Sequence, residues 1–342
     1  IISLLIFLMT IGIETNKFNK IISDKINKNN DQVKLELESI KFKFDINEIS
    51  LFLETNDPKI FYRKAIIPAK NIKVYIDFLS IIKADTRIEK VILNFSQIDI
   101  NEIKKLSTAL KPSNLTSFLN NKIQEGKLNT EIEIYLNKEN SLHNFIARGL
   151  VTDVKGEIFK GFTLENTKFS FFADKTDILI QNFSSQTQEI KIKDGDVKIN
   201  LSPEISLETN FKTIFNFKYG LKKYLSFASD LNYIQNLINF DGELNNNLNF
   251  SFDKTFRLKS YNYKSNGKIF NAKLNFKKPV DDYFSNEKIK DIAFFNTEIR
   301  TSLSAQKKLF DISGKYSLNK GRPLPFKLEN ILKNKTFNLK LN

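Results

Sequence analysis

Apolar and polar residues alternate along most of the chain after residue 125. Between Leu244 and Phe252, for example, Leu244, Leu248, Phe250 and Phe252 occupy even-numbered positions, while asparagine and serine fill the odd-numbered ones. A period of two places the apolar side chains on one face of a β-strand. The pattern predicts strands at 128–136, 145–154, 169–172, 178–183, 190–192, 197–201, 205–217, 244–252, 256–263, 269–276, 292–304 and 310–318.

Glycine occurs in a recurring three-residue pattern within this region. Six of the 11 glycines precede a charged residue and then an apolar one, namely Gly126, Gly156, Gly195, Gly242, Gly267 and Gly314. Glycine tolerates backbone conformations that other residues avoid. We therefore expect each of these glycines to turn the chain at the entry to a strand.

Helical periodicity is concentrated in the first third of the chain. Apolar spacing predicts helices over 78–83, 101–110 and 114–122, and a single later helix over 221–237. Short strands with polar turns between them favour an antiparallel meander, a closed β-sandwich or an extended sheet. We predict a mainly β protein with minor α content, divided near Gln124 into an α/β module, residues 14–124, and a β-repeat region, residues 125–342.

The N-terminal segment is almost entirely apolar. Residues 1–13 read IISLLIFLMTIGI and would span roughly 20 Å as a helix, against the roughly 30 Å of a bilayer core. Because the chain begins with isoleucine, we predict a truncated transmembrane anchor; a signal peptide and a buried core segment are the alternatives. An amphipathic helix carrying Phe18, Ile21, Ile22 and Ile26 follows, and would lie on lipid headgroups or cap a β core. Alternation continues up to Asn342, so we expect the sheet to extend beyond this end.

Composition adds little evidence for chemistry. The formal charge is +14, but lysines are spread singly along strands, which argues against a nucleic-acid partner. The charge then reflects a bias in residue usage without functional meaning, and the alternative is a weak attraction to anionic headgroups. Cysteine is absent, and the single histidine, His143, is expected in a turn. The chain contains no phosphate-binding loop and no nucleophile elbow. We therefore predict a protein that is not an enzyme and has no metal site and no cofactor.

Phenylalanine supplies the remaining candidate function. The chain has 32 Phe, many at the inward positions of strands, Phe270 among them. Such side chains would fill a sandwich core, or would form an open apolar surface that receives lipid acyl chains. The predicted lipid-binding residues are Ile132, Ile134, Leu136, Phe169, Phe171, Val197, Ile199, Leu201, Phe215, Phe217, Leu248, Phe250, Phe252, Leu274 and Phe276.

The order of these parts resembles the AsmA-like family of bacterial envelope proteins (AsmA/YhdP/TamB group). An N-terminal apolar anchor precedes residues 68–79 and 87–100, which look like the N-terminal module of that family, and residues 256–275 look like one of its β repeats. The family has no catalytic residues to carry over.

The resemblance implies an elongated, curved, antiparallel-rich sheet that forms an apolar groove. It also implies a single N-terminal span in the bacterial inner membrane, with the bulk of the chain in the periplasm, and phospholipid transport between inner and outer membranes. The implied partners are phospholipid acyl chains, the inner membrane, and outer-membrane or other envelope proteins. The alternative function is that of a structural factor that assists outer-membrane protein assembly.

Overall fold

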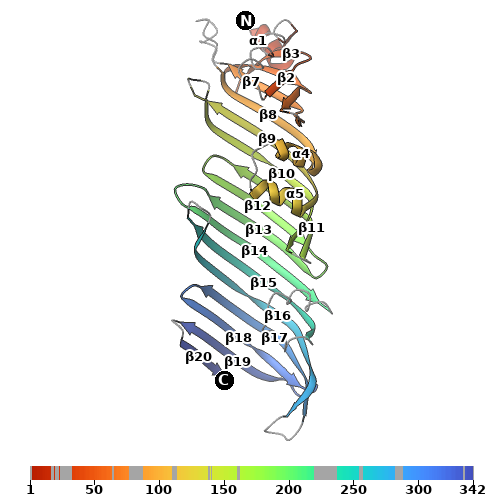
Figure 1. Ribbon diagram of the computed structural model, residues 1–342, viewed down its shortest axis with the longest axis vertical. Helices are drawn as coiled ribbons and strands as arrows, with labels where there is room; N and C mark the ends of the chain where they lie inside the picture. Colours follow the sequence, from red (N-terminus) through yellow and green to blue (C-terminus); the bar gives the residue numbers. More distant parts are fainter. Residues whose placement is uncertain are drawn as a thin grey trace. The chain divides into compact units, whose positions relative to one another are not determined.

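The chain is mainly β (Figure 1) and divides into two compact units. The computed structural model describes residues 2–16, 19, 23, 33–63, 65–76, 88–109, 114–137, 139, 141–159, 162–218, 237–253, 257–281, 288–333 and 336–341. Unit 1 comprises Ile1–Gly156 and Ser170–Lys175, and unit 2 comprises Glu157–Phe169 and Thr176–Asn342. The predicted boundary near Gln124 falls inside unit 1.

Unit 1 contains two antiparallel sheets. Its described elements are α1 (Ile2–Thr10), β1 (Ile13–Thr15), β2 (Val33–Glu36), β3 (Ile40–Asp45), β4 (Ser50–Asn56), β5 (Lys59–Tyr62), β6 (Ala65–Ile67), β7 (Asn71–Ile76), β8 (Ile88–Asp99), α4 (Ile100–Ala109), α5 (Asn114–Lys122), β9 (Ile123–Leu136) and most of β10 (Leu142–Phe159). The larger sheet pairs β1, β3, β4, β7, β8, β9 and β10 in that order. The smaller sheet pairs β2, β5 and β6.

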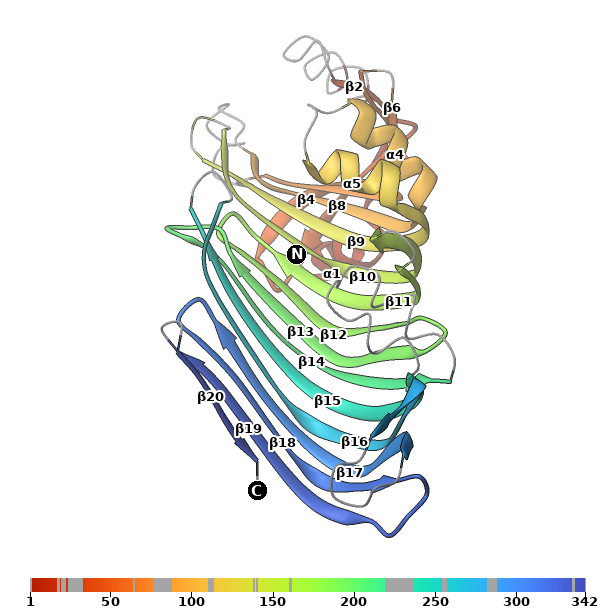
Figure 2. The same cartoon turned by 60° about the horizontal axis from the view of Figure 1, so that its bottom comes forward.

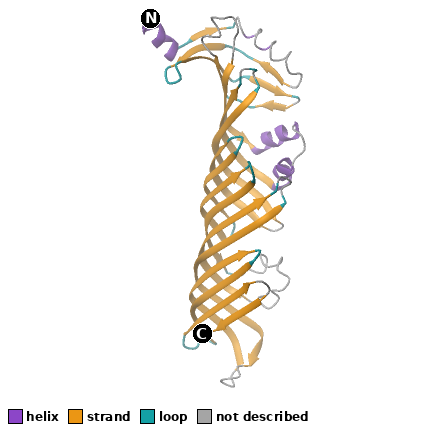
Figure 3. Cartoon of the chain, turned by 90° about the vertical axis from the view of Figure 1, so that its left-hand side faces the viewer, coloured by secondary structure: helices purple, strands orange, loops and turns teal. Residues whose placement is uncertain are grey.

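The helices predicted over 101–110 and 114–122 are confirmed as α4 and α5. A carboxylate oxygen of Asp99 accepts a hydrogen bond of 2.9 Å from the backbone N–H of Asn101, which satisfies a free donor at the start of α4. Both helices lie against the sheet at β8 and β9 (Figure 3). The core of unit 1 joins Leu35 and Ile60 of the small sheet to Ala69 and Ile72.

Unit 2 is a meander of long strands. Its described strands are part of β11 (Phe162–Ala173), β12 (Asp177–Gln186), β13 (Ile190–Asn200), β14 (Ile205–Phe217), β15 (Leu237–Phe252), β16 (Leu258–Asp281), β17 (Lys288–Ser304), β18 (Lys307–Leu318), β19 (Leu324–Lys333) and β20 (Thr336–Leu341). From β12 to β20 each strand pairs antiparallel with the next along the chain. The strands are curved along their length (Figure 2).

The antiparallel meander predicted from the alternation is confirmed, and the sheet is open. Each described strand of unit 2 packs extensively only against its neighbours along the chain. Among the described residues of this unit no second sheet faces the first, so the closed-sandwich alternative is not what these strands form.

The predicted transmembrane helix over residues 1–13 is not found. Helix α1 is nine residues long, about 14 Å, and Ile13 already belongs to β1. Gly12, at φ 75°, ends the helix: its N–H and that of Ile11 both donate to the carbonyl of Phe7 at 2.9 Å. Among the described helices none is both long and apolar enough to cross a bilayer.

The sequence pattern predicted that these glycines lie at the entries to strands, and this prediction is wrong. Gly195, Gly242 and Gly267 lie inside β13, β15 and β16, and the strands predicted at 256–263 and 269–276 are one strand of 24 residues. The physical reason is space. A Cβ built on Gly195 would lie 3.0 Å from Cβ of Phe183, and one on Gly242 would lie 2.8 Å from Cζ of Phe215. At Gly195 and Gly242, glycine thus lets an aromatic side chain of the preceding strand lie over the backbone, and at Gly267 it makes room for the backbone of Glu243 and Leu244.

Three predicted helices fall on residues whose structure is not described. The helix around 18–26 is described only at Asn19 and Ser23, and the helix over 78–83 is not described at all. Of the helix predicted over 221–237, only Leu237 is described, and it begins β15.

Candidate functional site

One side of the unit 2 sheet is a nearly continuous apolar surface, here called the apolar face. It is the side on which Phe215 lies, from Phe169 of β11 through β12–β19. Directly opposed pairs on neighbouring strands share a face, and the pairs Ile205–Phe252 and Leu207–Phe250 place apolar side chains of β14 and β15 together. The same surface continues onto β16, because Tyr261 lies directly opposite Phe250.

An aromatic cluster forms the most buried part of the apolar face. The ring centroid of Phe215 lies 4.7 Å from that of Phe240 and 6.0 Å from that of Phe217. Ile269 and Ala272 of β16 pack against these rings. Phe215 is only 5% exposed, so its ring is fully part of a packed core.

Most of the predicted lipid-binding residues lie together on the apolar face. Phe169 of β11 contacts Phe183 of β12 at a centroid distance of 6.1 Å. Leu274 lies opposite Ile292 of β17. The predicted residues that this face brings together are Phe169, Val197, Ile199, Phe215, Phe217, Leu248, Phe250, Phe252, Leu274 and, two residues beyond Leu274, Phe276.

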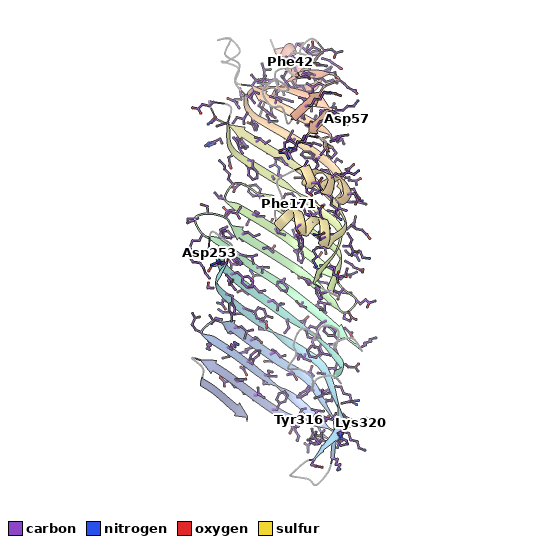
Figure 4. All side chains as sticks on the ribbon, viewed as in Figure 1. Phe42, Asp57, Phe171, Asp253, Tyr316 and Lys320 are labelled. Carbon is purple, nitrogen blue, oxygen red and sulfur yellow. The ribbon has the colours of Figure 1, made fainter. Side chains whose placement is uncertain are left out.

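Four predicted residues belong to unit 1 instead. Ile132 lies opposite Leu93 and Ile134 opposite Val91, and these two partners pack against the core beneath the small sheet. Leu136, on the same strand, lies opposite Leu142. Phe171 lies over Gly149, where a Cβ would meet its ring at 2.9 Å (Figure 4). The sequence could not separate these residues from the others because the same period of two runs through both units.

The sequence pattern placed two residues on the apolar side of a strand where the structure does not. Leu201 comes just after the last residue of β13 and is 38% exposed, because the strand ends before it. Phe270 is also 38% exposed, because β16 shifts register beside β15 between Ile269 and Asn271. Such a bulge inserts one residue, so the side chains after it point to the opposite sides of the sheet from those that strict alternation predicts. Phe270 therefore lies on the opposite, polar face and Ala272 on the apolar face.

Buried polar side chains interrupt the apolar face, and sequence reasoning missed them. The Asn246 amide nitrogen donates to Oγ1 of Thr213 at 3.0 Å, and its oxygen accepts from the Tyr263 hydroxyl at 2.9 Å. The hydroxyls of Thr167 and Ser185 are 2.6 Å apart. All these groups form hydrogen bonds within the protein, which lowers the free-energy cost of burying them. The sequence does contain a sign of this burial, because Asn246 occupies one of the even-numbered positions of the strand, between the apolar residues Leu244 and Leu248.

The polar face of unit 2 carries a shallow hollow of about 580 Å³. Asparagine, lysine and arginine side chains line it together with Phe211 and Leu309, and the amide nitrogen of Asn247 donates to the side-chain oxygen of Asn210 at 2.7 Å. Lys212, also in the lining, forms an ion pair of 2.7 Å with Glu243.

A charged cluster lies on the larger sheet of unit 1. The Lys90 side chain is buried, with its ammonium 4.5 Å from the ring centroid of Tyr75 and 2.6 Å from a carboxylate oxygen of Glu48. The Tyr135 hydroxyl donates to Glu133 at 2.6 Å, and Arg148 donates to the same carboxylate at 2.8 Å. The hydrogen bond to Glu133, followed by burial, raises the pKa of Tyr135 to about 12. Tyr75 likewise has a raised pKa, chiefly from burial and then from its hydrogen bond to Asp45.

Tyr135 is therefore expected to remain protonated while an ordinary tyrosine ionises. Its folded pKa exceeds the unfolded one, so its contribution to stability is complete below pH 10 and is lost as the pH rises towards 12. Titration of ¹³C-labelled tyrosine by NMR checks this, with Tyr135→Phe identifying the signal. Glu133→Gln should move the midpoint down towards pH 10; an unchanged midpoint would contradict the assigned cause.

The described residues contain no group of His, Cys, Asp or Glu able to hold a metal ion. His143 is the second residue of β10 and is exposed, rather than lying in a turn. Comparison with protein-family models, with curated proteins and with solved structures found no match.

Proposed function

We propose that the apolar face of unit 2 binds phospholipid acyl chains, and that the protein transfers lipid between the two membranes of a bacterial envelope, as AsmA-like proteins are thought to do. One observation carries the proposal: an extended apolar face on a single-layer sheet over which no described strand or helix of unit 2 packs extensively. Such a face needs cover from another apolar molecule.

Acyl chains match the chemistry of this surface. Each CH₂ group removed from water contributes about 0.8 kcal/mol, without any need for fixed hydrogen-bond geometry. Apolar rows run across the strands, for example Leu207 to Phe250 to Tyr261, so neighbouring strands offer successive similar contacts. A chain could therefore move from strand to strand without crossing a large barrier. The proposal includes an inner-membrane location with the bulk of the chain in the periplasm.

Site-specific photocrosslinking tests the lipid proposal. Benzoylphenylalanine replaces Phe250 on the apolar face or, as the matched control, Phe270 on the polar face. After expression in a bacterium and irradiation, mass spectrometry measures phospholipid attached to the purified protein. We expect attachment at Phe250 to exceed that at Phe270 at least tenfold.

Equal attachment at the two positions, or none at either, would overturn the proposal. Attachment of envelope proteins at Phe250 without lipid would favour the structural-factor alternative instead. Both probes replace a phenylalanine with a larger aromatic residue, and circular dichroism of each variant checks that the sheet still forms.

A further inference from the structure

The hairpin of β16 and β17 extends beyond the neighbouring strands of unit 2 at one end (Figure 1). Its described far part pairs Val280 with Ile289 and Asp281 with Lys288. This end of the unit carries basic residues that the proposed lipid face does not use. We call Lys278, Lys288, Lys290, Lys320 and Arg322 the basic end.

Asn319 holds the basic end together. Its amide nitrogen donates to the carbonyl of Lys288 at 2.9 Å, and its side-chain oxygen accepts from the N–H of Lys290 at 2.7 Å. Its own N–H donates to the carbonyl of Asp291 at 3.1 Å. Lys320, labelled in Figure 4, follows directly in a tight turn closed by a 2.7 Å bond from Gly321 N–H to the carbonyl of Leu318. Two separate segments thus present their cations side by side.

Among the described residues the basic end carries more positive than negative charge: its five cations stand against the exposed carboxylate of Asp281, which lies directly opposite Lys288. All five side chains are exposed, and among the described residues none of them forms an ion pair. The nearby carboxylate of Asp291 is 3.7 Å from Lys273 and so is already paired. By contrast, Lys43, Lys90 and Lys212 elsewhere in the chain each have a carboxylate within 2.7 Å.

Exposed apolar side chains lie at the same end. Val280 is 46% exposed next to the pair that contains Lys288, and Leu324, two residues after Arg322, is 48% exposed. Clustered cations beside exposed apolar groups match a bilayer surface, where phosphates face water and acyl chains begin just below. A nucleic acid or an acidic protein would match the charges but not Val280 and Leu324.

We propose that the basic end binds the surface of an anionic phospholipid bilayer. Lysine and arginine near such a surface each strengthen binding roughly fivefold, and salt screens the attraction within about 10 Å at 0.1 M. The docking requires no lipid on the apolar face, so it stands separately from the lipid-transfer proposal. It adds to that proposal a place where the protein meets a membrane.

Vesicle co-sedimentation tests this docking. The full chain is mixed with phosphatidylcholine vesicles, with or without 30 mol% phosphatidylglycerol, as the probe. The test variant carries Lys288→Gln, Lys290→Gln, Lys320→Gln and Arg322→Gln. The control variant carries Lys191→Gln, Lys193→Gln, Lys198→Gln and Lys264→Gln, which are exposed lysines elsewhere in unit 2 and give the same change in net charge.

We expect binding to anionic vesicles to fall at least tenfold in the test variant and less than threefold in the control. Val280→Asn with Leu324→Asn should weaken vesicle binding but leave heparin binding unchanged. Equal losses in the two glutamine variants would show a general charge effect and overturn the proposal, as would vesicle binding that none of the variants weakens. Benzoylphenylalanine placed at Phe250 in the same test variant should still capture phospholipid. Failure of the docking proposal is therefore distinguishable from failure of the lipid-transfer proposal.

Discussion

Replacing Phe215 by alanine is expected to lower the free energy of unfolding of unit 2 by about 3–5 kcal/mol. The ring is buried against Phe240, Phe217 and Ile269, and its removal leaves a cavity that a hydrogen-bonded sheet closes poorly. Hydrogen–deuterium exchange measures the loss. Peptides from β14 and β15 should exchange at least a hundredfold faster, since 1.4 kcal/mol corresponds to a tenfold change.

The control is Phe270→Ala on the same sheet. The same atoms are removed from a ring that is 38% exposed on the polar face, so the expected loss is below about 1 kcal/mol. Equal destabilisation by the two substitutions would show that the apolar face has no packed core at Phe215.

Gly242→Ala should destabilise the same region by about 1–3 kcal/mol. The new Cβ would lie 2.8 Å from Cζ of Phe215 and 3.0 Å from Cα of Ile269, and would come closer still to the carbonyl of Lys268. Two of these three atoms are backbone, so the strands must move apart. Gly→Ala also stabilises a protein by up to about 1 kcal/mol, because alanine lowers the conformational entropy of the unfolded chain. This stabilisation is smaller than the expected cost of moving the strands apart. Chemical denaturation followed by circular dichroism measures the net effect.

Asn245→Ala on the polar face of β15 provides the comparison and should change stability by less than about 0.5 kcal/mol. The double variant Gly242→Ala, Phe215→Ala should be less destabilised than the sum of the single variants, because the ring that meets the new Cβ is gone. Strict additivity would contradict the view that Gly242 makes room for the Phe215 ring as well as for the backbone of β16.

Periodicity predicted strands well and predicted their interruptions poorly. Val197, Ile199, Phe250 and Leu274 were assigned to one surface from alternation alone, and the register brings them to the same face. Phe270 was misplaced because a bulge adds a residue without any change in local hydrophobicity. A bulge depends on the partner strand, which the local sequence does not contain.

Glycine was misread for a related reason. The residues that explain Gly195 and Gly242 are Phe183 and Phe215, each on the preceding strand and more than ten positions away. Within the local sequence, a glycine that makes room for a ring looks the same as one that turns the chain. At the N-terminus, the apolar run likewise predicted one helix, whereas Gly12 ends it and Ile13 pairs with Phe42 of β3.

The sequence by itself determined the mainly β character and the positions of α4 and α5, and it limited the strands to a meander, a sandwich or an extended sheet, because these follow from local periods and from short connections between neighbouring elements. Only the tertiary structure decided that the apolar face of unit 2 is part of an open sheet, and that Ile132 and Ile134 belong with the core of unit 1. Burial depends on what lies across a face, and that partner comes from distant parts of the chain. Gly195 and Gly242 show the same division: the recurring glycine pattern marked a β region, and the neighbouring strands revealed that these two glycines make room for Phe183 and Phe215.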